Sequence, residues 1–555
     1  MTESFRIALA QLNPLMGDIA GNLAKARSAR ALAAAGGADL ILFSELFITG
    51  YPPEDLVLKP ALQADAREAV EKFALDTADG GPAVLIGTPW VEQGKLYNAC
   101  ALLDGGRVAG KTFKVDLPNY GVFDEKRVFM PGPLPGPFNI RGLRIGVPVC
   151  EDIWTPDVVE CLSETGGEIL LVPNGSPFEA GKEDVRLNMI GARVRESGLP
   201  LVYLNQVGGQ DEIVFDGASL VANADGKLAH ALPAWEETTV VTDWRRAGGG
   251  WVCVPGEIAP PEERSQAVYH AMMLGLRDYV NKNRFPGVVL GLSGGIDSAL
   301  SAAVAVDALG ADRVRCVMLP SRYTSPESLD DAAQCASLLG VGYETIPIEA
   351  AVQAFGTTLA PVFAGKRPDT TEENIQSRAR AVILMAISNK FGPMVLTTGN
   401  KSEMSVGYAT LYGDMCGGYN VLKDLYKMEV FRVARWRNQT HPRNALGPEG
   451  RVMPERVIDK PPSAELRENQ KDEDSLPPYA ILDGILECLV EREMSFEETC
   501  AKGFHPATVK RIEQLLYVSE YKRRQAPPGV KITHKNFGRD RRYPITNAFR
   551  DAREI

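Results

Sequence analysis

The chain has no apolar run long enough to cross a membrane, and this absence sets the first limit on its class. Its 555 residues contain no uninterrupted stretch of the roughly 18 apolar residues that a membrane-spanning helix needs. The first residues, MTESFRIALAQLNP, have no basic segment followed by an apolar one, so we expect no secretory signal. These two absences predict a cytoplasmic protein with no membrane partner.

Cysteine and histidine are sparse and scattered. The nine cysteines include no CxxC pair and form no cluster with the five histidines, which argues against a zinc site. Unpaired thiols fit a reducing compartment. The histidines stand in unrelated contexts, and we assign none of them to catalysis.

An excess of positive charge is also missing. Sixty lysines and arginines stand against 71 acidic residues, a formal net charge of −11. This balance argues against nucleic acid as the main partner. It does not exclude a phosphorylated small substrate, because such a molecule needs only a local cationic pocket.

The first half of the chain alternates short strands with a few helices. Residues 22–35 are rich in alanine with arginine and lysine, which predicts a helix. Aliphatic and β-branched segments bounded by Gly, Pro, Asn or Asp predict strands. The candidate strands are 5–11, 40–44, 83–88, 99–103, 144–149, 168–172 and 201–205. This alternation indicates a layered α/β domain.

A Gly- and Pro-rich break, GGGWVCVPGEIAPP at 248–261, separates the two halves. We therefore predict one domain over residues 1–250, a linker over 251–264 and a second domain over 265–555. The second half follows a strict strand–loop–helix order, which predicts a parallel, doubly wound sheet with its ligand at the carboxyl ends of the strands. The polar, Pro-rich segment 442–478 is expected to form a loop, with helices again at 479–490 and 506–521.

Three reactive side chains follow apolar strands in the first half: Glu45 in LFSELFITGYPPEDL, Lys114 in GKTFKVDLPNYGVFDE and Cys150 in IGVPVCEDIW. Amide hydrolysis through a thioester needs a nucleophile, a base and a cation that faces the developing oxyanion. Cys150 can attack, Glu45 can take the thiol proton and later activate water, and Lys114 can stabilise the thiolate and the oxyanion. Taken singly, each would be an ordinary buried or surface residue; the ordered trio within these flanks favours catalysis.

The flanks of this trio resemble the nitrilase superfamily over about residues 5–241. The resemblance implies an αββα sandwich with Glu45, Lys114 and Cys150 as a catalytic triad, and Glu125 as an additional supporting glutamate. For a glutamine substrate it also implies contacts to the amino-acid end from Ser176 and Lys182, and we expect Tyr120 to line the same pocket. The alternative for these last three residues is a polar loop with solvated side chains.

The most specific string in the chain is VVLGLSGGIDSALSAAV, in which a strand ends in a glycine-rich loop and a helix begins. Glycines let the backbone approach oxyanions, and the helix N-terminus supplies N–H donors. The loop is neither a Walker A loop nor a GxGxxG fingerprint, so it does not indicate hydride transfer. We expect phosphate groups to bind the residues of this loop, which are Gly291, Leu292, Ser293, Gly294, Gly295, Ile296, Asp297 and Ser298.

SGGIDS resembles the loop of the ATP pyrophosphatases, which cleave ATP between the α and β phosphates, and the resemblance implies that residues 291–298 bind ATP. With TTGNKSE at 397–403, GYATLYGDMCGGYNVLKDLYK at 407–427 and YKRRQAPPG at 521–529, the second half resembles the NAD synthetases over most of 266–546. This resemblance implies an adenine nucleotide alpha hydrolase, or Rossmann-like, fold. It places Thr398 near ATP, and Asn374, Glu403 and Lys522 at a deamido-NAD site. Asp297 and Glu403 are the candidate ligands for Mg²⁺.

Together the two resemblances imply an enzyme that hydrolyses glutamine and uses the ammonia, with ATP, to amidate deamido-NAD through an acyl adenylate, releasing AMP, diphosphate and glutamate. A homo-oligomer is expected, because both types of domain associate. One alternative is another glutamine amidotransferase of the ATP pyrophosphatase group, such as one that amidates a purine nucleotide. A second is a regulatory nucleotide-binding protein with a degenerate amidase.

Overall fold

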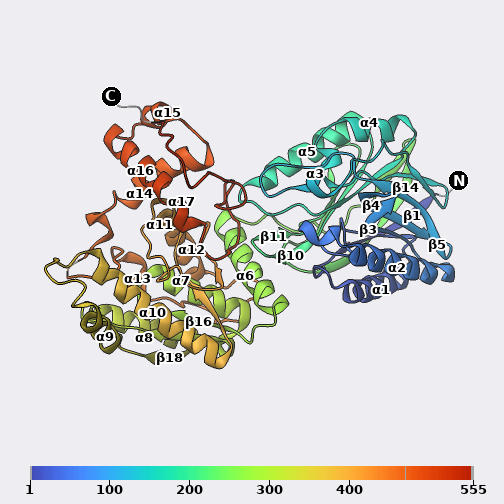
Figure 1. Cartoon of the computed structure of the whole chain (residues 1–555). Coiled ribbons are helices and arrows are strands. Elements are labelled where there is room, and N and C mark those ends of the chain that lie inside the picture. Colours follow the sequence, from blue (N-terminus) through green and yellow to red (C-terminus); the bar gives the residue numbers. More distant parts are fainter. Residues whose placement is uncertain (1–2, 469, 552–555) are drawn as a thin grey trace. The chain divides into compact units, whose positions relative to one another are not determined.

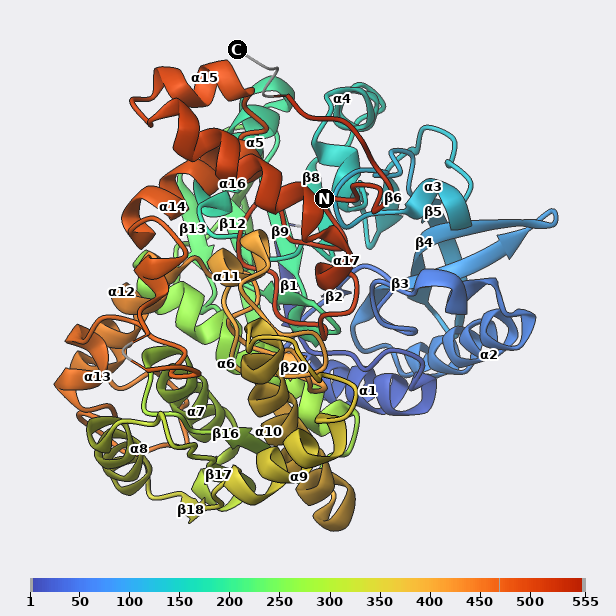
Figure 2. The same ribbon diagram turned by 60° about the vertical axis from the view of Figure 1, so that its left-hand side comes forward.

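The computed structural model describes residues 3–468 and 470–551, and the chain divides into two compact units at Glu262 and Glu263. Each unit has its own sheets and its own core (Figures 1 and 2). Among the described residues, no helix is both long and apolar enough to span a bilayer.

The first unit contains two large sheets with helices outside them. The first sheet has the order β15-β14-β1-β2-β3-β4-β5. Its strands are β1 (Ser4–Gln11), β2 (Leu40–Phe43), β3 (Ala83–Glu92), β4 (Lys95–Asp104), β5 (Arg107–Phe113), β14 (Thr238–Ala247) and β15 (Gly250–Cys253). The second sheet has the order β13-β12-β9-β8-β7-β6. Its strands are β6 (Phe138–Ile140), β7 (Leu143–Gly146), β8 (Ile169–Asn174), β9 (Leu201–Asn205), β12 (Leu220–Ala222) and β13 (Leu228–Ala231).

Strand β1 shows how the sequence builds these layers. Its side chains alternate between two cores, as the two-residue period of a strand requires. Phe5, Ile7 and Leu9 lie in the core between the two sheets. Ala8 and Ala10 face the opposite way and pack under the helices, where small side chains allow close approach.

Two helices cover the outer face of each sheet. Helices α1 (Ile19–Ala35) and α2 (Pro60–Asp76) pack on the first sheet, and α4 (Asp157–Glu164) and α5 (Lys182–Ser197) pack on the second (Figure 1). The layers are therefore helix, sheet, sheet, helix, which confirms the predicted αββα sandwich.

The predicted linker is wrong at its start. Residues 250–253 form β15, which pairs antiparallel with β14. Trp251 and Cys253 are buried between the sheets, and Gly248 and Gly249 take positive φ angles in the turn that joins the two strands. The glycines that suggested a flexible break therefore form the turn of a hairpin.

The second unit is built on a parallel sheet of order β18-β17-β16-β19-β20. Its strands are β16 (Val288–Gly291), β17 (Val314–Met318), β18 (Gly342–Thr345), β19 (Met394–Thr397) and β20 (Tyr419–Asn420). Helix α7 (Ile296–Leu309) packs against β16 and β17, and α6 (Arg264–Lys282) and α12 (Lys427–Gln439) pack on α7. Helix α10 (Thr370–Phe391) packs Leu384 and Ile387 against β16, β17 and β19. This confirms the predicted doubly wound fold.

The strand order reverses between β16 and β19. Ligands of open α/β sheets bind at such a point, outside the carboxyl ends of the strands. The loop that follows β16 leads into α7, and the loop that follows β19 leads into α11 (Lys401–Val406). Both predicted nucleotide loops therefore leave the sheet at its switch point.

A group of C-terminal helices shares a core with α11. Helices α14 (Tyr479–Leu486) and α16 (Pro506–Val518) contribute Leu482 and Leu516 to that core, and Figure 2 shows these helices gathered together. The segment predicted as loop at 442–478 is mostly irregular, but it includes α13 (Glu455–Asp459). Val452 and Met453 are fully buried, which explains why this segment is packed in place.

Candidate functional site

The predicted triad of the first unit lies at the ends of strands. Glu45 follows β2, Lys114 follows β5 and Cys150 begins a short turn after β7. All three side chains are buried. The ammonium Nζ of Lys114 lies 2.7 Å from Glu45 Oε1 and 2.8 Å from Glu125 Oε1. The structure therefore gathers these carboxylates around one buried cation.

Neighbouring donors fix the Glu45 carboxylate. Asn98 Nδ2 donates to its Oε1 at 2.7 Å, and the backbone N–H of Gly175 donates to its Oε2 at 2.9 Å. Hydrogen bonds to a carboxylate orient it and favour its charged form. Glu45 is thus held as an acceptor with both oxygens occupied.

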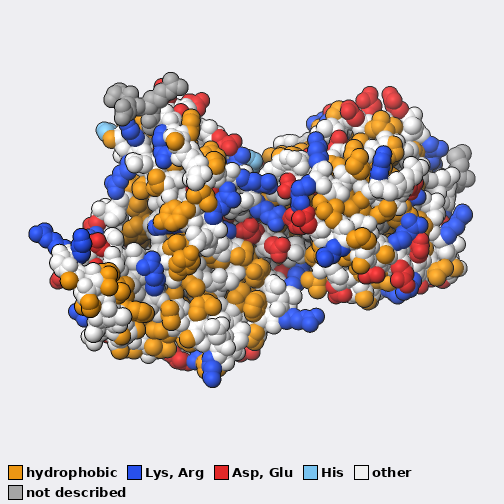
Figure 3. Space-filling model, in the orientation of Figure 1, with side chains coloured by type: hydrophobic (Ala, Val, Ile, Leu, Met, Phe, Trp, Pro, Cys, Tyr) orange, Lys and Arg blue, Asp and Glu red, His pale blue; other side chains and the backbone are white. Residues whose placement is uncertain are grey.

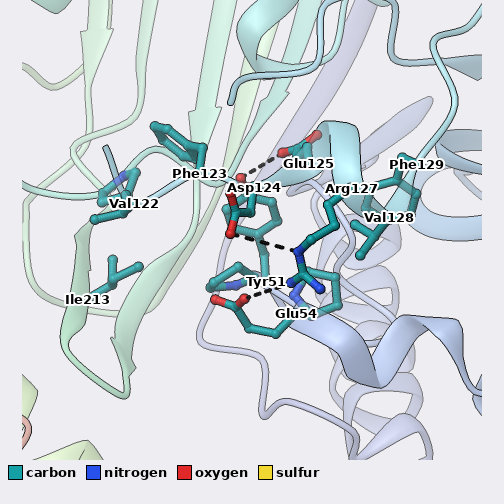
Figure 4. Close-up of a pocket in the computed structure, with 13 residues that line it drawn as sticks. Tyr51, Glu54, Val122, Phe123, Asp124, Glu125, Arg127, Val128, Phe129 and Ile213 are labelled. Carbon is teal, nitrogen blue, oxygen red and sulfur yellow. Dashed lines mark hydrogen bonds and ion pairs between the residues drawn. The ribbon is translucent and has the colours of Figure 1, made fainter. Parts of the chain in front are cut away.

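Glu125 is the second carboxylate on Lys114. It receives a hydrogen bond of 2.7 Å from Tyr51 OH, and Figure 4 shows the two residues side by side. Burial raises the pKa of Glu125 to about 7, against the opposing pull of Lys114. Burial alone would lower the pKa of Lys114, but Glu125 and Glu45 hold it well above its usual value. Lys114 therefore remains charged at neutral pH.

Cys150 has a strained backbone, with φ at +48°. Burial, and then the charge of Glu45, hold the pKa of its thiol well above the usual value, while Lys114 acts to lower it. The group is therefore a thiol at neutral pH and needs a base before it can attack. Asp152 fixes the turn, because it accepts from Val149 N at 2.9 Å and from Val115 N at 2.9 Å.

The three residues that were predicted to contact glutamine lie in different environments. Tyr120 OH donates to Glu151 Oε1 at 2.8 Å, and Lys182 acts electrostatically on the same carboxylate. Ser176 is buried, and its backbone N–H donates to Asn205 Oδ1 at 2.9 Å. Tyr120 thus contacts Glu151, next to the nucleophile, and Lys182 is near enough to stabilise the charge of that carboxylate. Ser176 directly follows Gly175, whose N–H binds Glu45.

The sequence analysis did not identify several polar residues of this site. Asn98, Glu151, Asp152 and the Gly175 N–H each touch the triad or its immediate neighbours. The acidic pair 151–152, directly after the cysteine, was a signal in the sequence. Asn98 lies within a strand and carried no signal of its own.

In the second unit, the loop after β16 forms a compact turn that leads into α7. Ser298 Oγ accepts from Ser293 N at 3.1 Å and lies 3.0 Å from Ser293 Oγ. Gly294 has φ at +79°, and a Cβ there would lie 2.3 Å from the carbonyl oxygen of Ser328. Only glycine fits at this position, so the loop depends on it.

Asp297 lies in a charged cluster. Lys427 Nζ is 2.5 Å from Asp297 Oδ2 and 3.3 Å from Glu403 Oε1. Asn400 Nδ2 donates to Asp297 Oδ1 at 2.9 Å and also caps the helix that carries Glu403. Burial raises the pKa of Glu403 to about 8, opposed by Lys427. Lys427 and Asn400 were not singled out in the sequence, although both stand inside the strings that carried the resemblance.

A cavity of about 620 Å³ opens at this edge of the sheet. It brings together the predicted ATP and deamido-NAD residues, apart from Gly294, which faces Ser328. Its lining includes Gly291, Leu292, Ser293, Gly295, Ile296, Asp297, Ser298, Thr398, Asn374, Glu403 and Lys522. Asn374 Oδ1 accepts from Thr410 Oγ1 at 2.9 Å, and Lys522 Nζ donates to the carbonyls of Gly407 and Ala409.

Residues 460–466, Gln470 and Asp472 line the same cavity. Glu465 accepts from Ser325 Oγ and Ser328 Oγ, each at 2.8 Å, and Arg467 pairs with Asp474. Asn469 lies outside the described residues. Residues 460–466 are therefore part of the cavity wall.

Comparison with known proteins agrees with the geometry of both units. The carbon-nitrogen hydrolase family matches residues 6–249, and the NAD synthase family matches residues 268–526.

The full-length relatives carry both parts. The glutamine-dependent NAD(+) synthetase of Rhodobacter capsulatus is 56% identical over 551 residues, covering 99% of this chain and 100% of that protein. That of Thermotoga maritima is 42% identical, with 99% and 100% covered. A solved structure of the Acinetobacter baumannii enzyme, in complex with adenosine diphosphate, matches with a TM-score of 0.78 at 42% identity, covering 99% of this chain and 100% of that one. The chain belongs to the glutamine-dependent NAD(+) synthetase family.

Proposed function

We propose that this chain hydrolyses glutamine and uses the ammonia, with ATP, to amidate deamido-NAD to NAD, the last step of NAD biosynthesis. The products are NAD, glutamate, AMP and diphosphate. One observation carries the proposal. A buried lysine–carboxylate centre beside a cysteine and a nucleotide-sized cavity with an SGGIDS loop occur in the same chain.

The amidase chemistry follows from the first site. Glu45 takes the proton of the Cys150 thiol, whose pKa is raised by burial, and the sulfur attacks the carboxamide carbon of glutamine. The charged Lys114 stabilises the oxyanion, ammonia leaves, and a thioester remains. Glu45 then activates water, which hydrolyses the thioester to glutamate and restores the thiol.

The amino-acid end of glutamine would be held beside Cys150. Glu151 offers a carboxylate for the α-ammonium group, and Lys182 offers a cation for the α-carboxylate. Tyr120 already contacts Glu151, and Ser176 lies on the strand end next to the Gly175 N–H. Supporting this assignment, burial lowers the pKa of Lys182, so an anion that enters the pocket would stabilise its charged form.

The ligase chemistry follows from the second site. The nicotinate carboxylate of deamido-NAD attacks the α-phosphate of ATP, and diphosphate leaves toward the Ser293–Ser298 loop, where backbone N–H groups and hydroxyls stabilise its charge. Ammonia then attacks the acyl adenylate and releases AMP. Thr398 contacts ATP, and Asn374, Glu403 and Lys522 contact deamido-NAD in this assignment.

Magnesium fits the carboxylates that share Lys427. Mg²⁺ usually binds one or two carboxylates together with substrate phosphates. Asp297 and Glu403 line the cavity beside the phosphate loop, and they are the residues that would hold the ion. When bound, the ion would neutralise charge on the phosphates of ATP.

We also propose a cytoplasmic homo-oligomer. The nine cysteines all remain free thiols, as in a reducing compartment.

Around α9 (Glu349–Leu359) and α10, large apolar side chains are exposed; they are Phe355, Val362, Val382 and Phe391. Figure 3 shows hydrophobic side chains spread over the visible face of this unit. Large exposed apolar side chains are typical of contact surfaces between subunits. Light scattering that finds a stable monomer at micromolar concentration would contradict the assembly.

The reaction is tested with the purified chain, ATP, Mg²⁺ and a panel of acyl acceptors. We expect NAD and AMP in equal amounts when deamido-NAD is supplied with glutamine or with an ammonium salt. Xanthosine monophosphate in place of deamido-NAD tests the purine nucleotide alternative, and amidation of that compound instead would refute the proposal. A chain that binds ATP but forms no AMP would support the regulatory alternative.

A further inference from the structure

Arg380 is a cationic side chain in the cavity wall that the mechanism above does not use. It stands on α10, and its Nε donates to the carbonyl oxygen of Leu319 at 2.9 Å. Across the ion pairs found among residues 3–468 and 470–551, no carboxylate lies within 4.0 Å of its guanidinium. A guanidinium carries five N–H donors, so this single bond leaves most of its donor capacity unused.

The other cations of the cavity are engaged differently. Lys427 pairs with Asp297 and Glu403, and Lys460 Nζ lies 3.0 Å from Asp331 Oδ2. Lys522 donates two hydrogen bonds to backbone carbonyls. Arg380 thus lines the cavity and has one uncharged hydrogen-bond partner, the carbonyl of Leu319. Its charged neighbours Glu465 and Asp414 act on it only at longer range.

Arg380 is partly buried, and the loss of water around its charge is costly. Desolvation lowers the pKa of Arg380 to about 10, which still leaves the group charged at neutral pH. A desolvated charge with no counter-charge in direct contact is unfavourable, and an anion that entered the cavity would relieve that cost. Arginine suits phosphate in particular, because its planar fork matches two phosphate oxygens.

The position of Arg380 indicates which anion it meets. Leu319 directly follows β17, the neighbour of the strand that carries the Ser293–Ser298 loop. One helical turn further along α10, Leu384 lies near Gly291, the last residue of β16, where an added Cβ would lie 3.6 Å from the leucine side chain. Arg380 therefore stands at the same sheet edge as the phosphate loop.

We propose that Arg380 binds the phosphate chain of the nucleotide opposite the Ser293–Ser298 loop. This inference rests on the proposed function, because it takes ATP as the occupant of the cavity. It assigns Arg380 a binding role through phosphate oxygens, with no contact to the base or the ribose required.

Calorimetric titration of Arg380→Gln with ATP and with adenosine, both in the presence of Mg²⁺, tests the proposal. We expect ATP to bind about 10- to 100-fold more weakly than to the unmodified protein, as for the loss of a charge-assisted contact. Adenosine should bind unchanged. Equal weakening of both ligands, or unchanged ATP binding, would overturn the proposal. Arg451→Gln, an exposed arginine outside the cavity, is the matched control.

A measurement on the unmodified protein covers the case in which the variant does not fold. Phenylglyoxal modifies arginine, and mass spectrometry locates the modified residue. ATP should protect Arg380 and adenosine should not, whereas equal protection by both would contradict a phosphate contact. Failure of the proposed function is distinguishable, because the unmodified protein would then not bind ATP or would not amidate deamido-NAD.

Discussion

Each unit has a lysine held between two carboxylates, and the two centres differ in how open they are. Lys114, Glu45 and Glu125 have side chains that are 0%, 0% and 6% exposed. Lys427 is similarly buried at 2%, but its partners Asp297 and Glu403 are 18% and 17% exposed, on the wall of the 620 Å³ cavity. One centre is closed, and the other opens onto space that a nucleotide could fill.

The difference follows from what each centre must do. A nucleophile site gains from charges fixed before the substrate arrives, because no reorganisation is then needed in the transition state. A nucleotide site must let its carboxylates exchange a lysine partner for phosphates and a metal ion. The closed centre should therefore lose stability when its lysine is neutralised, while the open centre should tolerate the loss of its lysine structurally but not catalytically.

The largest expected effect separates the two sites completely. Cys150→Ala removes the sulfur that forms the thioester, so NAD synthesis from glutamine should fall by roughly 10⁴-fold or more. Synthesis from an ammonium salt at raised pH should remain near the unmodified rate, since the second unit has its own core and its own loop. Assays of NAD formation with glutamine alone and with the ammonium salt alone measure the two expected results.

Cys161→Ala is the matched control for this variant. Cys161 is a partly buried cysteine of the same unit whose sulfur contacts the carbonyl of Pro135. It should retain both activities. Full activity of Cys150→Ala with glutamine would exclude Cys150 as the nucleophile, and loss of both activities in a folded protein would show that the units cannot act separately.

The converse loss is expected in the open centre. Asp297→Asn keeps the shape of the side chain but removes its charge, so adenylate formation should fall by about 10³-fold, the scale of a lost electrostatic contact to transferring phosphates. Both nitrogen sources share the adenylate, so NAD formation from both should be lost, while glutamate release should persist. Asp312→Asn, an exposed aspartate of the same unit, is the control. Normal NAD synthesis by Asp297→Asn would refute the assignment of the loop.

Stability distinguishes the centres in a third way. Lys114→Met leaves Glu45 and Glu125 facing each other in the closed site, a loss of about 3–5 kcal/mol in the free energy of unfolding. Lys427→Met should cost only about 1 kcal/mol, because water reaches Asp297 and Glu403 from the cavity. Urea unfolding of both variants measures the two losses. The double variant Lys114→Met/Glu125→Gln should recover part of the stability that Lys114→Met loses. Equal losses in the two single variants would refute the difference between the closed and the open centre.

The fold could be predicted from the sequence because it depends on local patterns, and the strings around Glu45, Lys114 and Cys150 allowed these residues to be proposed as a triad. Strand β1 alternates between two cores, and the strictly ordered second half predicts a doubly wound sheet. The hairpin at 248–253 was missed because glycines mark a turn as readily as a linker, and only the burial of Trp251 tells them apart. Long-range partners such as Asn98 and Lys427 could not be predicted, since 53 and 130 residues separate them from Glu45 and Asp297.

A sequence motif can also mislead when the secondary structure around it differs from that of the family. The string GGRVAGKT at 105–112 matches the P-loop pattern GxxxxGK[ST]. It runs from the turn after β4 into the antiparallel strand β5, and no helix follows to present N–H groups to a phosphate. By contrast, the SGGIDS string has both the strand and the helix that its chemistry needs, and it lines the cavity.

The smallest effect concerns the pH dependence of the closed centre. Burial raises the pKa of Glu125 to about 7, whereas an unfolded glutamate titrates near 4.3. Between these values the folded state holds a proton that the unfolded state has lost, so stability falls as pH rises through this window. Glu125→Gln has no proton to lose, and its free energy of unfolding should rise relative to the unmodified protein by about 2 kcal/mol between pH 5 and 7. Urea unfolding at half-unit steps of pH, followed through the transition of the first unit, measures the difference.

Glu160→Gln, on the exposed face of α4, is the matched control. A difference that stays flat for Glu125→Gln would mean that Lys114 keeps Glu125 ionised across this range, and a difference that falls with pH would reverse the sign of the coupling. Either result would place the charge of the closed centre on both carboxylates, which would make it more like the open centre than its burial implies.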